Sequence, residues 1–290
     1  MDKWKSENGV LTVVSSVGLS DICFVDMLGH EPGATARWLE DDIGPEFNSR
    51  NVHTEVVPVA NERALRRLVK SLMRDAQKLG RRPWLHFEAH GDATGIAFGD
   101  GTRLDWSKFF DRMRPLNIVT HNSLCITLAS CFSFSQIGSF SFEHRAPFFM
   151  AFGWNRVVGD GEIREFIPAF YRECILRGRL DCKRPSGMRC YSAEEELIKV
   201  VGSVLMQNHT GRGRRALREK MVTDGVGRGL SPNLARRFAR AFEDDVIDAV
   251  LAPMWETFLM ADQPANDGRF AVHLDMLLDL ARQARQQTRS

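Results

Sequence analysis

Residues 84–91 read Trp84-Leu-His-Phe-Glu-Ala-His90-Gly91, a mostly apolar run of strand length that ends in a base and a glycine. A second run, residues 124–131, reads Leu-Cys-Ile-Thr-Leu-Ala-Ser-Cys and ends in a thiol in the same way. An unbroken apolar run such as 124–129 is typical of a strand that is buried on both faces of a parallel sheet. The two runs therefore predict two buried strands, each leading into a reactive side chain.

The connection between the two runs has the composition of a crossover. Residues 95–101 predict a short strand or hairpin arm with a turn at Gly99-Asp100-Gly101, and residues 105–113 predict a short helix with Asp105 as its N-cap. A helical connection of this length allows the two strands to be parallel neighbours. We then expect His90 and Cys131 side by side at the carboxyl edge of the sheet, where functional groups gather.

The remaining pattern predicts an α/β fold, with a mostly parallel sheet flanked by helices. Helices are expected at 61–79 and 162–177, the first from its apolar repeat at helical spacing. Strands are expected at 10–15, 55–60 and 147–152. Pro58 predicts an edge position for the strand at 55–60, because proline has no N–H to donate to a ladder.

The strand-rich part ends near residue 180, and only helices are expected beyond it. They are predicted at about 193–207, 213–222, 231–261 and 268–287. We therefore expect two domains: residues 1–184 as the α/β domain, and residues 185–290 as a C-terminal helical region packed on it or appended to it. The last two helices carry amphipathic stripes that must be covered by something.

Composition places the chain among ordinary globular proteins, with 290 residues and a formal net charge of +2. It has no signal-peptide pattern and no apolar stretch long enough to span a bilayer, so we expect a cytoplasmic protein that does not enter the membrane. The six cysteines form no Cys-x-x-Cys pair, which favours free thiols in a reducing compartment. Cys174, Cys182 and Cys190 are evenly spaced, but zinc sites favour close ligand pairs, so buried thiols are the simpler interpretation.

His90 and Cys131 make chemical sense as a catalytic dyad. A thiol is a weak nucleophile until it is deprotonated, and a nearby imidazole assists that step and can then protonate a leaving amine. Gly91 permits a sharp turn after the base, and its N–H could form an oxyanion hole with the N–H of Cys131. This chemistry needs no metal and no cofactor.

At these segments the chain resembles the caspase-like cysteine peptidases, and within them the CHAT branch. The resemblance rests on an apolar strand ending in His90-Gly91, a hairpin with a Gly-Asp-Gly turn, a helix, and an apolar strand ending in Ser130-Cys131. Residues 146–154, Asp160 and residues 169–171 also resemble the CHAT pattern, so the resemblance covers roughly residues 10–180. It implies a cysteine endopeptidase that acts through a Cys-His dyad on a protein substrate, in a bacterial stress, immunity or programmed-death pathway.

The primary specificity pocket is expected beside the dyad, between the loop after the first strand and the loop after the strand at 147–152. Asp21 and Asp160 are the candidate substrate-binding acids there. If either lines the pocket, a basic residue before the scissile bond would be preferred, through a charge-assisted hydrogen bond. The alternative is that both acids cap loops or helices.

Several other assignments compete with this one. Cys125 is a rival nucleophile, but its place inside the apolar run predicts a core position. His86 could join His90 in a metal site, or Glu88 could orient a histidine, because alternate strand residues share a face. Neither is favoured: the spacing is not that of a helical zinc motif, and members of the family usually work as a dyad.

Two alternatives concern partners. The basic stretch 211–220 could contact nucleic acid, but no aromatic residues interleave with it, and a solvated helix face is the simpler interpretation. The whole chain could instead be a catalytically weak or inactive scaffold that acts through its C-terminal helices. Retention of both His90 and Cys131 favours the enzyme, and a regulatory protein partner bound to the C-terminal helices is expected to switch it on.

Overall fold

The computed structural model shows two compact units. Its described residues are 5–7, 10–12, 18–29, 34–135, 137, 142, 144–178, 184–200, 211–227, 231–237, 239, 252–266 and 269–270. The first unit contains Met1–Ser141 and Arg145–Ala193, and the second contains Phe142–His144 and Glu194–Ser290. The boundary therefore falls after residue 193, whereas the sequence predicted it after residue 184.

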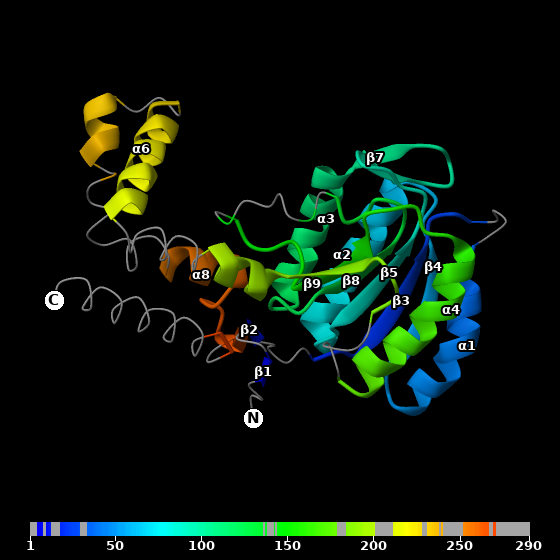
Figure 1. The fold of residues 1–290 in the computed structure, drawn as a ribbon. Coiled ribbons are helices and arrows are strands. Elements are labelled where there is room, and N and C mark those ends of the chain that lie inside the picture. The colour runs from blue at the N-terminus through cyan, green and yellow to red at the C-terminus, as the bar shows by residue number, and fades with distance from the viewer. Residues whose placement is uncertain are drawn as a thin grey trace. The chain divides into compact units, whose positions relative to one another are not determined.

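A six-stranded sheet forms the centre of the first unit, in the order β10-β9-β8-β5-β3-β4 (Figure 1). The strands are β3 (Asp21–Asp26), β4 (His53–Pro58), β5 (Pro83–Glu88), β8 (Cys125–Ala129), β9 (Met150–Trp154) and β10 (Met188–Ser192). Five of them run parallel, and β10 pairs with β9 in the antiparallel sense. The predicted α/β fold with a mostly parallel sheet is thus confirmed, and the prediction that only helices follow residue 180 is wrong because of β10.

The start of the chain differs most from the prediction. β2 (Val10–Thr12) pairs only with β1 (Lys5–Glu7) in a small separate sheet, and residues 13–15 lie outside the described part. The sequence analysis missed β3 and the helix α1 (Ala36–Ser49). β3 has only four apolar residues between two aspartates, and α1 contains Gly44 and Pro45, which interrupt the helical pattern.

The next two elements agree closely with the prediction. β4 lies at the edge of the sheet, as Pro58 indicated. α2 (Glu62–Leu79) begins after Asn61, whose side chain accepts a hydrogen bond from the Ala64 N–H at 3.0 Å. It ends at Gly80, which has a φ of +69°, the left-handed conformation that glycine adopts without strain.

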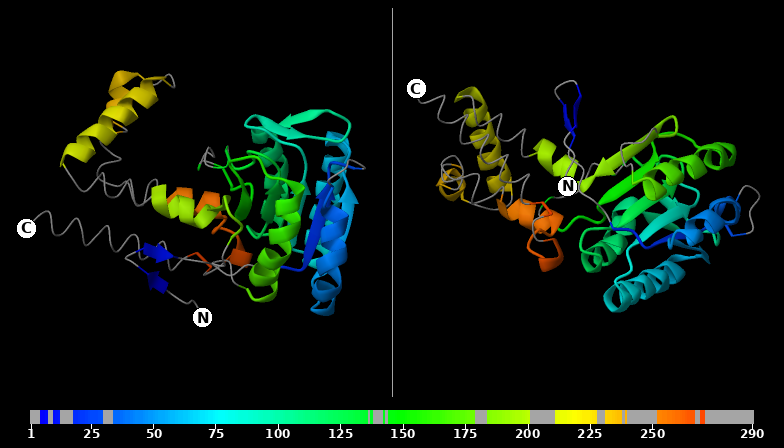
Figure 2. Two further views of the ribbon diagram at one scale, coloured as in Figure 1. Left: turned by 45° about the vertical axis from the view of Figure 1, so that its right-hand side comes forward. Right: turned by 90° about the horizontal axis from the view of Figure 1, so that it is seen from below.

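Helices cover both faces of the sheet (Figure 2). α1 and α4 (Asp160–Tyr171) contact each other on one face, and α2 and α3 (Trp106–Val119) contact each other on the other. Alternate residues of β5 explain the two layers: the Trp84 ring meets the Phe170 ring of α4 edge-on, and the Phe87 ring meets the Phe109 ring of α3 at 4.9 Å. α4 is followed by a π-helical turn, Arg172–Leu176.

The connection between β5 and β8 contains the predicted hairpin and helix. The hairpin is formed by β6 (Gly95–Ala97) and β7 (Arg103–Asp105). α3 extends to residue 119, beyond the predicted end at 113, because the helix continues through Pro115. Asp105 takes the N-cap position without a side-chain hydrogen bond, and β9 begins three residues later than predicted.

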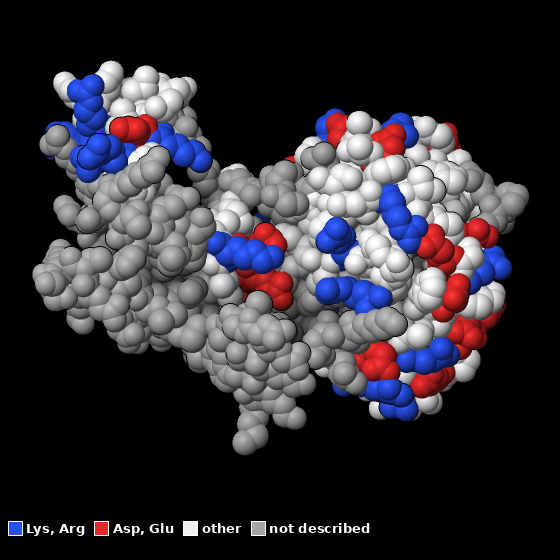
Figure 3. Space-filling view, viewed as in Figure 1, with Lys and Arg blue, Asp and Glu red and all other residues white. Residues whose placement is uncertain are grey.

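The second unit is mainly helical where it is described, with turns or bends at residues 260–263. Residues 193–200 begin a helix at the boundary of the two units, and α6 (Gly211–Gly227), residues 232–237 and α8 (Ala252–Leu259) follow. Basic side chains gather on α6 (Figure 3), including Arg215, Arg218 and Lys220. The predicted helix at 268–287 and most of the stripe at 231–261 lie outside the described residues. Among the helices that are described, none is long and apolar enough to cross a membrane.

Candidate active site

The two sequence motifs come together at the carboxyl edge of the sheet. β5 and β8 are adjacent and parallel, as predicted, and their last register pair is Glu88 with Ala129. His90 and Cys131 each follow two residues after that pair, so both lie just beyond the carboxyl edge of the sheet. His90 is exposed and Cys131 is half-buried, which leaves both within reach of a ligand arriving from solvent.

Gly91 lies directly against the second motif. A Cβ at position 91 would lie 2.0 Å from the Ser130 Oγ and 2.9 Å from the Cys131 carbonyl oxygen. Real Cβ atoms do not approach other heavy atoms so closely, so this position requires glycine. The His-Gly turn and the Ser-Cys turn are therefore in backbone contact.

The two strands separate where the motifs begin. The Ala89 N–H still donates to the Ala129 carbonyl, but at a long 3.5 Å. In a parallel ladder the next bond would join the Cys131 N–H to the Ala89 carbonyl, and this bond is not formed. The Cys131 N–H consequently makes no hydrogen bond to any residue that the structure describes.

The Gly91 N–H is left open by the hairpin. The bonds from Asp92 N–H to the Gly95 carbonyl (3.1 Å) and from Ala97 N–H to the His90 carbonyl (2.8 Å) bracket Gly91 without using its own N–H. Within the described residues, the Gly91 N–H has no acceptor. The N–H groups of Gly91 and Cys131, which lack acceptors among the described residues, could together form an oxyanion hole.

Asp92 fixes the hairpin that follows Gly91. Its carboxylate accepts hydrogen bonds from the Thr94 N–H (2.7 Å) and hydroxyl (2.6 Å) and pairs with Arg103 at 2.6 Å. These contacts, led by the Thr94 hydroxyl, lower the pKa of Asp92 to about 2. The Trp106 Nε1 donates to the Asp92 carbonyl at 2.8 Å, which ties this turn to the start of α3.

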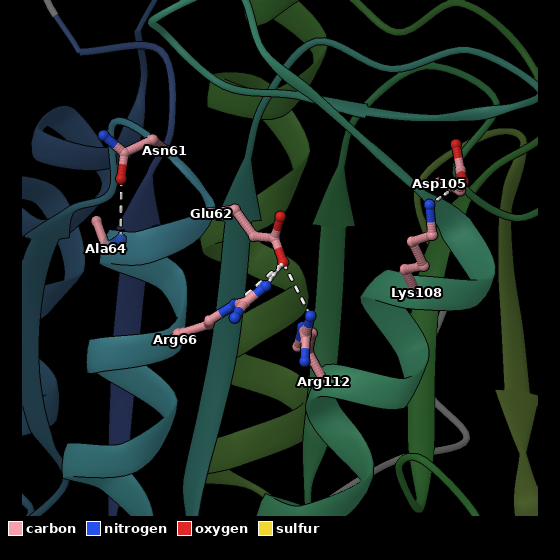
Figure 4. Close-up of polar contacts among 7 residues, drawn as sticks. All are labelled: Asn61, Glu62, Ala64, Arg66, Asp105, Lys108 and Arg112. Atoms are coloured by element: carbon pink, nitrogen blue, oxygen red, sulfur yellow. Dashed lines mark hydrogen bonds and ion pairs between the residues drawn. The ribbon is translucent and has the colours of Figure 1, made fainter.

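The crossover helix α3 is held to α2 through one carboxylate (Figure 4). Glu62, in the first turn of α2, accepts hydrogen bonds from Arg66 at 2.6 Å and from Arg112 of α3 at 2.9 Å. Arg66 lies four residues after Glu62 on the same helix, so the contact to Arg112 is the one that joins two elements. This contact helps to fix the helix that delivers the chain to β8.

Cys131 lies beside the loop between β9 and α4. Its Sγ is 3.8 Å from the Val158 carbonyl oxygen. The next residue, Phe132, has a φ of +54°, which is uncommon for a bulky side chain and marks a tight turn after the thiol. Cys125, the rival nucleophile, is buried inside β8, where the sequence analysis expected a core residue.

His86 belongs to a buried polar cluster rather than to the edge of the sheet. Its Nδ1 is 2.7 Å from the Tyr171 hydroxyl, while the Trp84 Nε1 donates to the Thr127 hydroxyl at 2.9 Å. Complete burial lowers the pKa of His86 to about 3, so the ring is neutral. In the described part of the chain, no three His, Cys, Asp or Glu side chains are grouped so that they could hold a metal ion.

Glu88 is committed to the start of α1. Its carboxylate accepts hydrogen bonds from the Thr35 N–H and hydroxyl, and from the Ala36 N–H at 2.6 Å. A carboxylate at a helix N-terminus satisfies donors that have no partner within the helix. Burial nevertheless raises the pKa of Glu88. The alternative that Glu88 orients a histidine has no support among these contacts.

The two candidate substrate-binding acids lie in different places. Asp21 is the first residue of β3, in register with Pro83, so it lies at the opposite end of the strands from His90. It is buried, with Arg81 Nε 3.7 Å from its carboxylate, and the structure does not bring it to His90 and Cys131. Asp160 is exposed in the first turn of α4, two residues after Val158, and thus follows the loop that contacts Cys131.

The cysteines that the structure describes form no disulfide. They are Cys23, Cys125, Cys131, Cys174 and Cys190. Cys174 is buried and Cys190 is half-buried on β10, while Cys182 lies outside the described residues. The proposed zinc alternative therefore concerns a residue whose position the structure does not describe.

Two contributors to the site were missed by sequence reasoning. Ser133 donates to the Leu128 carbonyl at 3.1 Å and accepts from the Trp154 N–H at 3.2 Å, which ties the turn after Cys131 to β9. Arg156 accepts the Phe132 N–H on its backbone carbonyl at 3.2 Å. A hydroxyl two residues after Cys131 was a visible signal, but nothing local distinguishes Arg156 from other surface arginines.

Comparison with known proteins adds no assignment to this geometry. No protein-family model matches the chain, and no curated protein matches its sequence.

Proposed function

We propose that this chain is a caspase-like cysteine peptidase of the CHAT type, with Cys131 as nucleophile and His90 as general base and acid. The observation that carries the proposal is the meeting of two motifs at one sheet edge. Gly91 touches Cys131, and both residues have a backbone N–H without an acceptor among the described residues. Gly91 and Cys131 are only half-buried, so a carbonyl oxygen arriving from solvent could accept hydrogen bonds from both N–H groups, as acyl transfer requires.

The reaction follows from these groups. His90 takes the thiol proton as the Cys131 Sγ bonds to the carbonyl carbon of the scissile peptide, and the carbonyl oxygen becomes an oxyanion held by the Gly91 and Cys131 N–H groups. The imidazolium then protonates the leaving amine as the C–N bond breaks, which leaves a thioester. His90 next activates a water molecule, which attacks the thioester and releases the acid product and the thiol.

The setting is part of the same proposal. Free thiols throughout the described residues support a reducing compartment, and we place the enzyme in the cytoplasm, in a bacterial stress, immunity or programmed-death pathway. A protein partner bound to the C-terminal helices is proposed to stimulate it. Val226 and Leu234 are exposed apolar side chains of the second unit that such a partner could cover.

Covalent labelling tests the proposal. A peptidyl acyloxymethyl ketone should modify Cys131 alone, as located by mass spectrometry of the intact chain and its fragments. Cys190→Ala is the matched control, since it removes the other half-buried thiol and should label like the wild type. An inactive scaffold would show no selective modification at Cys131, and that result would refute the peptidase.

A further inference from the structure

The turn after Cys131 has a conformation that its own residues do not favour. Phe132 has a φ of +54°, in the left-handed region that bulky residues rarely occupy. Such a conformation persists only where surrounding contacts hold it, and it is concentrated at functional sites. The residues that hold Phe132 therefore control where the Cys131 thiol lies.

The end of β9 and the loop after it provide that hold. The Phe132 N–H donates to the Arg156 carbonyl at 3.2 Å, and the Phe134 N–H donates to the Trp154 carbonyl at 3.1 Å. The turn thus runs beside the first residues of the loop that connects β9 to α4. Its position depends on how firmly that loop is fixed.

The Arg156 side chain fixes the loop through hydrogen bonds from both terminal nitrogens of its guanidinium group, which form a planar fork. Nη1 and Nη2 donate to the two Glu162 carboxylate oxygens at 2.9 and 2.6 Å. The same nitrogens also donate to the Val157 carbonyl at 2.8 Å and the Ser186 carbonyl at 2.9 Å. Gly187 makes room for this arrangement, because a Cβ there would lie 2.6 Å from the Arg156 Nε. Only a planar guanidinium can make all four contacts together.

The same ion pair also fixes the loop segment that lies against the Cys131 thiol. Glu162 also accepts the Gly159 N–H at 3.4 Å, so the loop is held at both ends, at Arg156 and at Gly159. Val158 lies between these anchors, and its carbonyl oxygen is the one that lies 3.8 Å from the Cys131 Sγ. The hydrogen bonds from Arg156 lower the pKa of the Glu162 carboxyl below its ordinary value.

We propose that Arg156 is a positioning residue for Cys131: its ion pair with Glu162 holds the Phe132 turn and the Val158 carbonyl and so orients the thiol. The catalytic role of Arg156 rests on the proposed peptidase function. Its hold on the segments beside Cys131 does not depend on that function. The hydrogen bonds of the Arg156 side chain go to Val157, Glu162 and Ser186, and not to Cys131. Arg156 acts through the backbone of the two segments that flank the nucleophile.

The experiment compares five variants of the full chain. Arg156→Ala removes the fork, Arg156→Lys keeps the charge but not the fork, and the double variant Arg156→Glu with Glu162→Arg rebuilds the pair in reverse. Arg177→Ala is the matched control, because it removes an arginine from the surface ion pair with Glu173. Glu162→Gln serves if Arg156→Ala does not fold. The measurements are Cys131 labelling by the peptidyl ketone, its alkylation by iodoacetamide, and amide hydrogen exchange of the 131–135 segment.

We expect Arg156→Ala to slow peptidyl labelling by roughly tenfold to a hundredfold, since misplacement of a reacting group by about 1 Å has effects of this size. Exchange of the 131–135 amides should become faster, Arg156→Lys and Glu162→Gln should be intermediate, and the reversed pair should recover part of the rate. Arg177→Ala should match the wild type. Wild-type labelling and exchange in Arg156→Ala, or in Glu162→Gln if Arg156→Ala does not fold, would overturn the inference.

The two proposals fail separately. A wild-type chain that resists the peptidyl ketone refutes the peptidase, because that probe needs a substrate site. Iodoacetamide needs only the thiol, so a change in alkylation and in exchange of the 131–135 segment on Arg156 substitution would still support the positioning role. Unchanged alkylation and exchange alongside normal peptidyl labelling would refute the positioning role and leave the peptidase standing.

Discussion

Gly91 and Cys131 are in such close contact that no side chain fits between them. A Cβ at position 91 would lie 2.9 Å from the Cys131 carbonyl oxygen, which belongs to the backbone and cannot rotate away. The contact joins the turn that carries the proposed base to the turn that carries the proposed nucleophile.

Gly91→Ala should lower both stability and activity. The added methyl group also meets the Ser130 Oγ at 2.0 Å, and overpacking of this kind costs about 1–3 kcal/mol. Urea unfolding and Cys131 labelling measure the two effects. Ser130→Gly in the same chain should recover only part of the stability and little activity, because the contact with the Cys131 carbonyl remains.

Gly161→Ala is the control for the glycine experiment. A Cβ at position 161 meets nothing within 4 Å, and the residue lies in the first turn of α4. Alanine should leave labelling unchanged and stabilise the fold by about 0.4–1 kcal/mol. If Gly91→Ala behaves like this control, the close contact between Gly91 and Cys131 does not affect stability or labelling.

Cys131→Ala and His90→Ala should each reduce peptide cleavage by roughly a thousandfold or more, and the double variant should be little worse, because a dyad acts as a unit. His90 is exposed and Cys131 is half-buried, so neither change should disturb the core. Cleavage rates and thermal unfolding measure the two quantities. Full activity in either single variant would contradict the assignment.

His86 should make the fold sensitive to acid. Burial lowers its folded pKa to about 3, well below its ordinary value of 6.5, so the unfolded chain binds the proton more readily between these values. The contribution of neutral His86 to the free energy of unfolding is complete above pH 6.5. It decreases as the pH falls towards 3, by about 1.4 kcal/mol for each pH unit. Between pH 7 and pH 5 the loss should be about 2 kcal/mol.

The pH experiment compares urea unfolding of the wild type with His86→Gln at both pH values. Glutamine does not titrate, so the wild type should lose about 2 kcal/mol more than the variant on acidification. His53→Gln, which changes an exposed histidine on the edge strand, should follow the wild type. Equal pH dependence of His86→Gln and the wild type would mean that His86 is not held neutral in the core.

Of the two candidate substrate-binding acids, Asp160 is the one that we expect to influence substrate preference. It is exposed two residues after the Val158 carbonyl that faces Cys131, whereas Asp21 lies at the far end of the strands. A peptide library should show a preference for basic residues before the scissile bond, and Asp160→Asn should weaken it several-fold. Asp111→Asn, on the exposed side of α3, is the control. A profile with only apolar residues at that position would remove Asp160 from the pocket.

Much of the sheet could be predicted because its information is local. The runs 84–89 and 124–129 are continuous and apolar, and the structure has β5 and β8 there as parallel neighbours. Asn61 and Gly80 bounded α2 correctly, since caps are read from single residues. β3 escaped prediction because its two end residues are aspartates, and their burial depends on Arg81 and on the amides of residues 28 and 29.

The candidate catalytic residues could be predicted from the sequence, because one predicted strand ends in His90-Gly91 and a later one ends in Cys131. Their environment could not. The unused N–H of Cys131 exists because β5 and β8 separate after Ala129, and the hold on Phe132 comes from Arg156, which lies 24 residues further along. Local sequence sets backbone preference and periodicity, whereas such contacts join segments distant in the chain, and their formation depends on how the whole sheet and its helices pack.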